Sequence, residues 1–388
     1  MPVRPPRRMS SEAWHDALFA LSRSRVAREL GVHVRTVQRW RQGDREPADE
    51  HKRKLVNAAF PATRRTALER VGEGGERSTV LEWVRRDRTE ASLLDWLADL
   101  REHADEWVRA VPQPPTPKRA PAALLNLLPI GDHHHGMHAW ARETGADDHD
   151  ILRSETLLLG AVDLLLTRAP VAQMALVAVM GDFMHADTPA ARTERGGHAL
   201  DVDTRYSRVL RSGYELLMRT VYRALERHER VIVVIIPGNH DPVSSLVLSM
   251  LLEVAWRDCD RVRVDAEPRE RKYYAHGATL LGFAHGHRRT KPTELPELMA
   301  AERTEDWGRS RQRYIYTGHV HHRRVFETRA ATVESLRVLP PADAWHAAEG
   351  YGATREMLCI THHNRYGEIA RQTASVLEVD DASRSDSP

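Results

Sequence analysis

The sequence predicts an α/β protein with a small all-α domain at its N-terminus. From residue 124 onward, short apolar runs alternate with amphipathic stretches, a pattern typical of buried strands separated by helices. Residues 12–60 show helical patterns only, and a proline-rich segment separates the two regions. A chain of 388 residues has room for one large core and an accessory module.

The N-terminal domain, residues 1–60, is predicted to be a helix-turn-helix. Two short helices at 24–30 and 34–42 are separated by a break at Gly31. The motif needs a small residue where the helices touch, a glycine in the turn and apolar anchors on the second helix. The matching residues are Arg23, Ala27, Gly31, Val32, Val37 and Trp40. DNA binding is the function that this motif favours, and a role in protein contacts alone is the alternative.

The charge distribution supports a DNA-binding role for this end of the chain. Residues 1–65 hold 15 Lys and Arg against 7 Asp and Glu, a net charge of +8, which leaves 42 against 48, or −6, for the rest. Outward positions of the second helix carry side chains that contact phosphates and base edges. The residues expected to bind DNA are Arg35, Thr36, Gln38, Arg39 and Arg41.

Four further segments follow. An apolar stripe that includes Leu81, Trp83 and Trp96 predicts a helical connector at 61–111. Prolines predict a stiff linker at 112–121. A large α/β domain is expected at 122–375 and a disordered tail at 376–388.

The large domain is predicted to contain five buried strands, at 124–130, 174–180, 231–236, 279–284 and 314–317. Helical stretches at 151–167, 204–228 and 243–256 lie between the first four strands. Residues after 325 alternate as antiparallel strands do, with a hairpin expected around 364–367.

Polar residues of one chemical kind follow each of the five strands, which is where open α/β sheets bind ligands. The segments are Asp132-His133-His134-His135-Gly136, Gly181-Asp182-Phe183-Met184-His185, Gly238-Asn239-His240-Asp241, His285-Gly286-His287 and Gly318-His319-Val320-His321. Carboxylate, amide and imidazole groups suit two hard divalent cations, and one carboxylate can bridge them. Alternation along an extended segment places His133 and His135 away from the metals.

These motifs resemble, in content and order, those of the calcineurin-like metallophosphoesterases over residues 124–370. The resemblance implies a β-sandwich flanked by helices in four αββα layers, and phosphoester hydrolysis by a water that two divalent metal ions activate. Manganese is expected, with iron, zinc, nickel or cobalt as alternatives. The metal ligands that the resemblance implies are Asp132, His134, Asp182 and His321 for one ion and Asp182, Asn239, His285 and His319 for the other. His240 would contact the phosphate and protonate or stabilise the leaving oxygen.

His185 directs the expected substrate towards nucleic acid. Protein phosphatases have Gly-Asp-x-x-Asp-Arg at this place, whereas Gly-Asp-x-x-His is similar to the nuclease subunits of double-strand-break repair complexes. That likeness implies that His185 lies beside His240 in the catalytic site. In the strength of its motifs and its Arg-rich composition, the chain also resembles metallophosphoesterases of phages and prophages. The short stretch after His321 argues against the ATPase partner of the repair nucleases.

The loop at 188–205 has two interpretations: its Arg192, Arg195 and Arg205 either bind substrate phosphates or belong to a solvated insertion. We expect a cytoplasmic, DNA-binding phosphodiesterase with DNA as its partner. Its expected activity is that of a deoxyribonuclease. A phosphomonoesterase or small-nucleotide phosphodiesterase with a regulatory helical domain is the alternative. No apolar run reaches the ~18 residues of a membrane helix, and a homodimer remains an open alternative.

Overall fold

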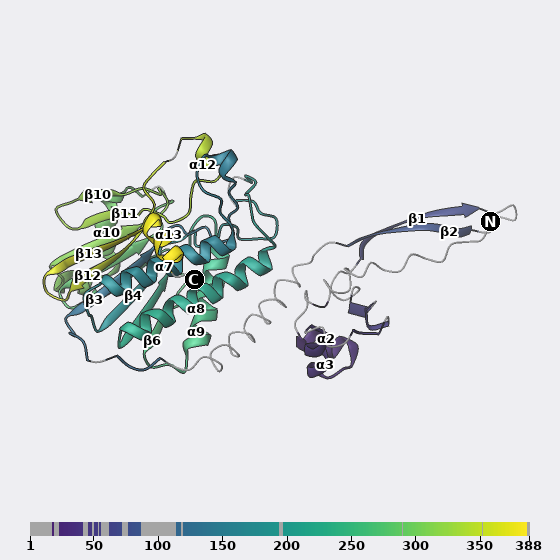
Figure 1. Cartoon of the computed structure of the whole chain (residues 1–388), viewed down its shortest axis with the longest axis horizontal. Helices are drawn as coiled ribbons and strands as arrows, with labels where there is room; N and C mark the ends of the chain where they lie inside the picture. The colour runs from purple at the N-terminus through teal and green to yellow at the C-terminus, as the bar shows by residue number, and fades with distance from the viewer. Residues whose placement is uncertain are drawn as a thin grey trace. The chain divides into compact units, whose positions relative to one another are not determined.

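The computed structural model describes residues 18, 23–41, 46–48, 50–52, 54–55, 62–71, 77–86, 114–117, 119–193, 197–288, 290–350 and 352–385. The chain divides into two compact units, Met1–Glu106 and Trp107–Pro388 (Figure 1). No helix in the described parts is both long and apolar enough to cross a membrane.

The first unit contains two short helices joined by a tight turn, α2 (Arg23–Leu30) and α3 (Val34–Arg41). Gly31 takes the left-handed conformation, with φ of 66°, and Val32 N donates to Ala27 O at 2.9 Å. The two helices bury a small apolar core made of Leu18, Val26, Ala27, Leu30, Val37, Trp40 and Leu55. The helix positions predicted from the sequence are therefore correct for this pair.

A β-hairpin follows these helices, where the sequence predicts a helical connector. Strands β1 (Ala62–Val71) and β2 (Arg77–Arg86) pair antiparallel, with Leu68 opposite Leu81 and Thr66 opposite Trp83. The helical prediction for 61–111 is wrong for these strands, because apolar residues two apart, such as Leu81 and Trp83, fit the alternation of a β-strand as well as the stripe of a helix. The rest of 61–111 lies outside the described residues.

The second unit is built on two β-sheets. The six-stranded sheet has the order β13-β12-β3-β4-β5-β6, and β3 to β6 run parallel. Its strands are β3 (Leu124–Ile130), β4 (Met174–Val179), β5 (Arg230–Ile235), β6 (Val262–Asp265), β12 (Glu356–His363) and β13 (Gly367–Ser375). The hairpin expected around 364–367 joins β12 to β13.

The five-stranded sheet has the order β10-β11-β9-β8-β7. Its strands are β7 (Arg271–His276), β8 (Thr279–Ala284), β9 (Gln312–Thr317), β10 (Arg324–Glu327) and β11 (Thr332–Ser335). Buried side chains of both sheets form one cluster, in which Leu127 and Leu176 of the first sheet join Leu281, Phe283 and Tyr316 of the second. The two sheets therefore share a core.

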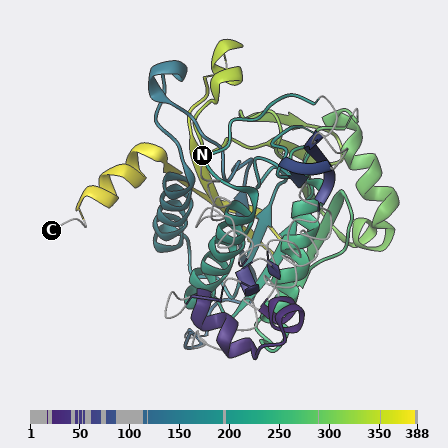
Figure 2. The ribbon, with the colours of Figure 1, turned by 90° about the vertical axis from the view of Figure 1, so that its right-hand side faces the viewer.

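Helices cover the outer faces of the sheets (Figures 1 and 2). Against the six-stranded sheet lie α7 (Ile151–Arg168), α8 (Tyr206–Arg227) and α9 (Pro242–Trp256). Beside the five-stranded sheet are η1 (Pro292–Glu294), α10 (Leu295–Glu302) and α11 (Thr304–Arg309), and Leu295 and Met299 pack on Ile315 and Val333. The second unit is thus a mixed α/β structure, as the sequence predicts.

The predicted tail is more structured than expected. Residues 376–385, expected to be disordered, form α13 (Val376–Ser385). Val379 is fully buried, close to Gly160 of α7, and Arg153 pairs with Asp380 at 2.5 Å. The disorder prediction is therefore wrong for these residues. The tail is rich in acidic residues and serine, and such a composition does not reveal that its apolar side chains pack on α7. In the linker, Pro114 O accepts a hydrogen bond from Arg261 Nη1 at 2.7 Å.

Candidate metal centre

The carboxyl ends of five strands converge at one edge of the second unit. The loop after β3 supplies Asp132 and His134, and the loop after β4 supplies Asp182 and His185. From the loops after β5, β8 and β9 come Asn239, His240, His285, His319 and His321. Eight of these nine sequence-predicted residues form three groups of potential ligands: His134, His185 and His240; Asp132, His134 and His321; and Asp182, His285 and His319. The ninth, Asn239, contacts His285.

The backbone is strained at four of these residues. His134, Asp182, His319 and His321 have φ values of 46°, 48°, 70° and 56°, in the left-handed region that non-glycine residues rarely adopt. Among the described residues, Ala191 is the one other non-glycine with positive φ. Such strain costs on the order of 1–3 kcal/mol per residue and persists where the surrounding structure requires a particular side-chain direction. Here that direction is towards a common point.

Asp132, His134 and His321 form the first group. His321 Nε2 lies 3.3 Å from His134 Nε2 and 3.5 Å from Asp132 Oδ1. Asp132 is fully buried, and both its oxygens accept from His319 N, at 2.8 and 2.9 Å. This bond links the loop after β9 to the loop after β3.

Asp182 and His285 form the centre of the second group. His285 Nε2 lies 3.0 Å from Asp182 Oδ2 and 3.1 Å from Asn239 Oδ1. His285 Nδ1 contacts Met180 O at 2.9 Å, and because a carbonyl oxygen can only accept, Nδ1 must carry a proton. In the neutral ring, Nε2 would then direct its lone pair at two acceptor oxygens. A cation between these three atoms removes the repulsion, so the donor set fits a bound metal ion.

The ionisation of the carboxylates and of His134 agrees with that interpretation, whereas His285 would have to lose a proton before binding a metal ion. Burial alone would lower the pKa of His285, but the carboxylates of Asp182 and Asp132 raise it to about 10. Burial alone would raise the pKa of Asp182, but His285 holds it below its ordinary value. The pKa of His134 falls well below its ordinary value because the ring is buried and lies near His240 and His321. The centre therefore offers charged carboxylates and a neutral His134, the forms that bind metals.

His240 and His185 lie beside the first group. Their rings stack with centroids 5.6 Å apart, and His185 Nδ1 lies 3.2 Å from His134 Nδ1. His240 Nδ1 contacts His185 O at 3.0 Å, so this nitrogen is the donor. Burial and then the proximity of His240 lower the pKa of His185 to about 3. His185 Nε2 is buried and has no hydrogen-bond partner in the described parts of the protein.

Asp241 holds two of the loops together. Its carboxylate accepts from Gly238 N at 2.9 Å and from Asp182 N and Met184 N, both at 3.1 Å. Gly238 is required here, because a Cβ at this position would collide with the Asp182 carboxylate. Burial and then the charge of Asp182 raise the pKa of Asp241 to about 7.

The histidines that flank His134 are buried in a different environment. His133 Nε2 and His135 Nδ1 share the hydroxyl of Ser154, at 2.9 and 2.8 Å. His135 Nε2 contacts Ser212 Oγ at 3.0 Å. Both rings also stack on Phe183. These two histidines pack against the loops after β3 and β4, on the side that faces α7 and α8.

His346 and Asp343 are two residues near the site that the sequence interpretation missed. The ring of His346, in the short helix α12 (Ala344–Ala348), stacks on His321 with centroids 5.0 Å apart and an angle of 24°. Asp343 Oδ1 accepts from His346 Nδ1 at 2.7 Å and from His346 N at 2.8 Å. Burial alone would raise the pKa of Asp343, but these bonds lower it to about 2. The Asp-x-x-His spacing of a helix N-cap was the available signal.

A cavity of about 90 Å³ opens beside the second group. His285 and Gly318 line one end of it, and Val320, Phe326 and Val333 contribute apolar walls. Two arginines at its edge already have partners, since Arg271 pairs with Glu302 and Arg288 with Glu270.

The other predicted site residues belong to the loop before α8 and to the first unit. Arg192 Nη1 donates to Gly197 O at 2.7 Å within its own loop, Arg205 precedes α8, and Arg195 lies outside the described residues. In the first unit, Arg35 and Arg39 are exposed, while Thr36 and Gln38 are half-buried. Arg41 is the exception in the DNA-binding set. Its guanidinium donates to Leu18 O at 3.1 and 3.3 Å, so its side chain stabilises the helical core instead of reaching outward.

Comparison with known proteins adds little at this level of similarity. No family model and no curated protein matches the chain. Similar solved structures include a predicted phosphoesterase of Streptococcus pneumoniae, 10% identical, with 66% of this chain and 99% of that chain covered and a TM-score of 0.28. Vps29 of Entamoeba histolytica in complex with Zn²⁺ is 14% identical, with 65% and 99% covered and a TM-score of 0.27. At these values the site has to be judged from its own geometry.

Proposed function

We propose that the chain is a metal-dependent phosphodiesterase of the calcineurin-like kind and that its substrate is DNA. The observation that carries the hydrolase proposal is the convergence of Asp132, His134, Asp182, His319 and His321, four of which have strained left-handed backbone. Strain of this kind requires a compensating role for the side chains. The two sheets with helices on their outer faces suit the four-layer arrangement of that family.

We infer two metal positions, with manganese as the first ion to test. Bound divalent cations would supply Lewis-acid stabilisation of the phosphate charge and a water nucleophile at neutral pH. Asp132, His134 and His321 would hold one ion, and Asn239, His285 and His319 the other, with Asp182 shared between them. Asp241 keeps the loops that carry Asp182 and Asn239 at a fixed separation through its three backbone hydrogen bonds.

His240 is the proposed proton donor to the leaving oxygen. Because its Nδ1 donates to His185 O, its Nε2 is the nitrogen that can exchange a proton with the substrate. His185 stacks on His240 and contacts His134, so it positions both rings. The group His134, His185 and His240 is also close enough to bind a cation, and metal titration of the His185→Ala variant separates the two roles.

A diester fits this site better than a monoester. A terminal phosphate is a dianion that enzymes bind with additional cationic side chains, but two of the three arginines that line the cavity beside the second group, Arg271 and Arg288, are paired with glutamates. The cavity of about 90 Å³ beside His285 has apolar walls suited to a second ester substituent. A phosphomonoesterase remains the alternative function.

Support for DNA as the substrate comes from the first unit. Arg35 and Arg39 project from α3 into solvent, and residues 1–65 carry a net charge of +8 from 15 basic and 7 acidic residues. A basic helix-turn-helix would raise the local concentration of DNA near the metal centre.

The proposal is tested with the purified full chain, manganese and labelled linear, nicked and single-stranded DNA. We expect cleavage of at least one DNA form and of bis(p-nitrophenyl) phosphate, with p-nitrophenyl phosphate a poorer substrate. Cleavage of the diester dye but no DNA form, lost in Asp182→Asn, would reject DNA and retain the phosphodiesterase. Preference for the monoester dye would favour the alternative.

A further inference from the structure

Two tryptophans are exposed near the metal centre. Trp140 is 52% exposed and precedes α6 (Ala141–Thr144), and Trp345 is 59% exposed and lies in α12. The two short helices contact each other (Figures 1 and 2). Exposed aromatic side chains that adjoin a functional site supply flat faces on which the bases or rings of a ligand can stack.

A continuous series of aromatic rings connects Trp345 to the metal centre. Trp345 contacts the ring of His346 edge to face, with centroids 4.9 Å apart and an interplanar angle of 86°. His346 stacks in turn on the candidate ligand His321 at 5.0 Å. The hydrogen bonds from His346 to Asp343 fix the start of α12, so the position of Trp345 relative to His321 is defined.

Trp140 is connected to the same edge through a different segment. Ala139 and His149 exchange backbone hydrogen bonds, and His138 N donates to Asp201 O at 2.9 Å. The segment from the candidate ligand His134 to Trp140 is therefore fixed by backbone hydrogen bonds to two other loops. Both tryptophans extend from segments that carry metal ligands or contact them.

We propose that Trp345, with Trp140, stacks on the bases of a single-stranded nucleic acid whose phosphodiester lies at the metal centre. Base stacking needs one exposed π-face for each base, whereas a protein partner would need a contiguous apolar surface. Single-stranded bases are free to stack, and those of a duplex are not. This inference rests on the proposed function and specifies single-stranded DNA, or a locally opened duplex, as the substrate.

The test compares two oligonucleotides of equal length, oligodeoxythymidylate and an abasic strand with the same phosphates. Binding is measured by fluorescence anisotropy on full-length protein with Asp182→Asn, so that no cleavage occurs. Stacking of one base contributes about 1–3 kcal/mol, or about 5- to 150-fold in affinity. We expect Trp345→Ala to weaken oligodeoxythymidylate binding by such a factor, with little change for the abasic strand and partial recovery in Trp345→Phe.

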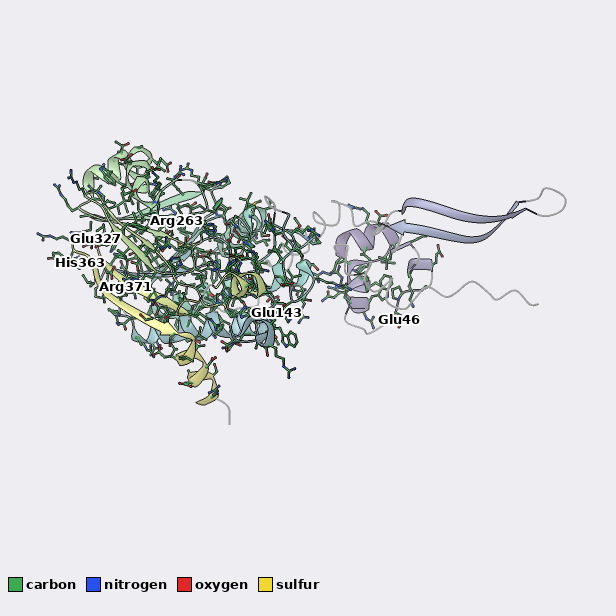
Figure 3. All side chains as sticks on the ribbon, turned by 90° about the horizontal axis from the view of Figure 1, so that it is seen from above. Glu46, Glu143, Arg263, Glu327, His363 and Arg371 are labelled. Atoms are coloured by element: carbon green, nitrogen blue, oxygen red, sulfur yellow. The ribbon has the colours of Figure 1, made fainter. Side chains whose placement is uncertain are left out.

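Tyr366→Ala is the matched control. Tyr366 is 60% exposed in the turn between β12 and β13. Its neighbour His363 pairs with Leu124 at the start of β3, and Figure 3 shows His363 at the opposite end of the unit from Glu143 of α6. This variant should bind both strands as the parent does. The inference is overturned if Trp345→Ala weakens both strands equally or neither.

The outcomes for the two proposals differ. In one outcome, Trp345→Ala selectively loses oligodeoxythymidylate binding, and the protein with intact Asp182 cleaves no nucleic acid. That result would retain the stacking site and reject the nuclease. Cleavage of single-stranded DNA with equal affinity for both strands in parent and variant would retain the nuclease and reject the stacking site.

Discussion

The two units carry their candidate functional residues in opposite ways. In the second unit, Asp132, His134 and Asp182 are almost fully buried, and the backbone is left-handed at the latter two. In the first unit, Arg35 and Arg39 are exposed on a regular helix. Buried polar groups reduce stability unless hydrogen bonds, ion pairs or a ligand compensate, and strained backbone adds to that cost. An exposed arginine on a helix has almost no such cost.

This difference determines how strongly each region supports a function. The second unit gathers buried ligand-type side chains on strained backbone, so its geometry favours a metal centre by itself. The arrangement in the first unit suits DNA but also suits a protein contact, so it needs an experiment. Substitutions in both units test the contrast, beginning with the largest expected effect.

Asp182→Asn should reduce diester hydrolysis by at least about 1,000-fold, because it removes the charge of the shared ligand while keeping its shape. Metal content by atomic emission should fall with it, and DNA binding by the first unit should not change. Asp163→Asn is the control, since Asp163 pairs with Arg223 on the helices away from the site, at 2.6 Å. Full activity in Asp182→Asn would refute the metal assignment.

Trp40→Ala tests whether the first unit is a separate folded module. Trp40 is 6% exposed in the small core beside Val37 and Leu18. Truncation should destabilise that unit by about 3–5 kcal/mol. Calorimetry should show one transition shifted down, with DNA binding abolished and normal hydrolysis of bis(p-nitrophenyl) phosphate.

The mirror-image control is Trp256→Ala, which removes a buried tryptophan from α9 of the second unit. It should lower the other calorimetric transition and leave DNA binding in place. A single transition that shifts in both variants would contradict the division into two units.

The sequence predictions were more accurate for strands made of apolar residues than for features that depend on tertiary contacts. Strands β3 and β8 begin and end at the predicted residues, because runs such as 124–130 are mostly apolar and are buried on both faces. Strand β7 was missed because one of its buried residues is a lysine. Lys272 is 3% exposed and pairs with Asp265 at 3.2 Å. Apolar patterns cannot find a strand whose buried residue is charged.

The metal centre was predictable in content but not in geometry. The glycines and ligand types around Asp182 and His319 are visible in the sequence, whereas left-handed backbone at these residues contradicts their intrinsic preference. His346 was missed because its contact with His321 depends on tertiary packing. The contact of Arg41 with Leu18 could not be predicted for the same reason, since helical periodicity gives no information on the carbonyl of Leu18.

Arg35→Ala with Arg39→Ala should weaken DNA binding, because two cations that neutralise phosphates are removed. The slope of log K against log salt should fall by about 1 for each phosphate that is no longer neutralised. Hydrolysis of bis(p-nitrophenyl) phosphate is the internal reference for the second unit. Arg309→Ala with Arg384→Ala removes the same charge from positions where both side chains are highly exposed, at 75% and 82%. An unchanged slope, or an equal change in this control, would remove DNA recognition from α3.

The histidine triplet 133–135 gives the finest test, because adjacent residues of one type have different surroundings. His134→Gln should lose metal, since both ring nitrogens of His134 face other histidines. His135→Gln should keep its metal and most of its activity, and should lose about 1–3 kcal/mol of stability because the hydroxyls of Ser154 and Ser212 each lose one hydrogen-bond partner. Equal metal loss in both variants would show that the centre depends on the packing beneath it as much as on the ligand itself.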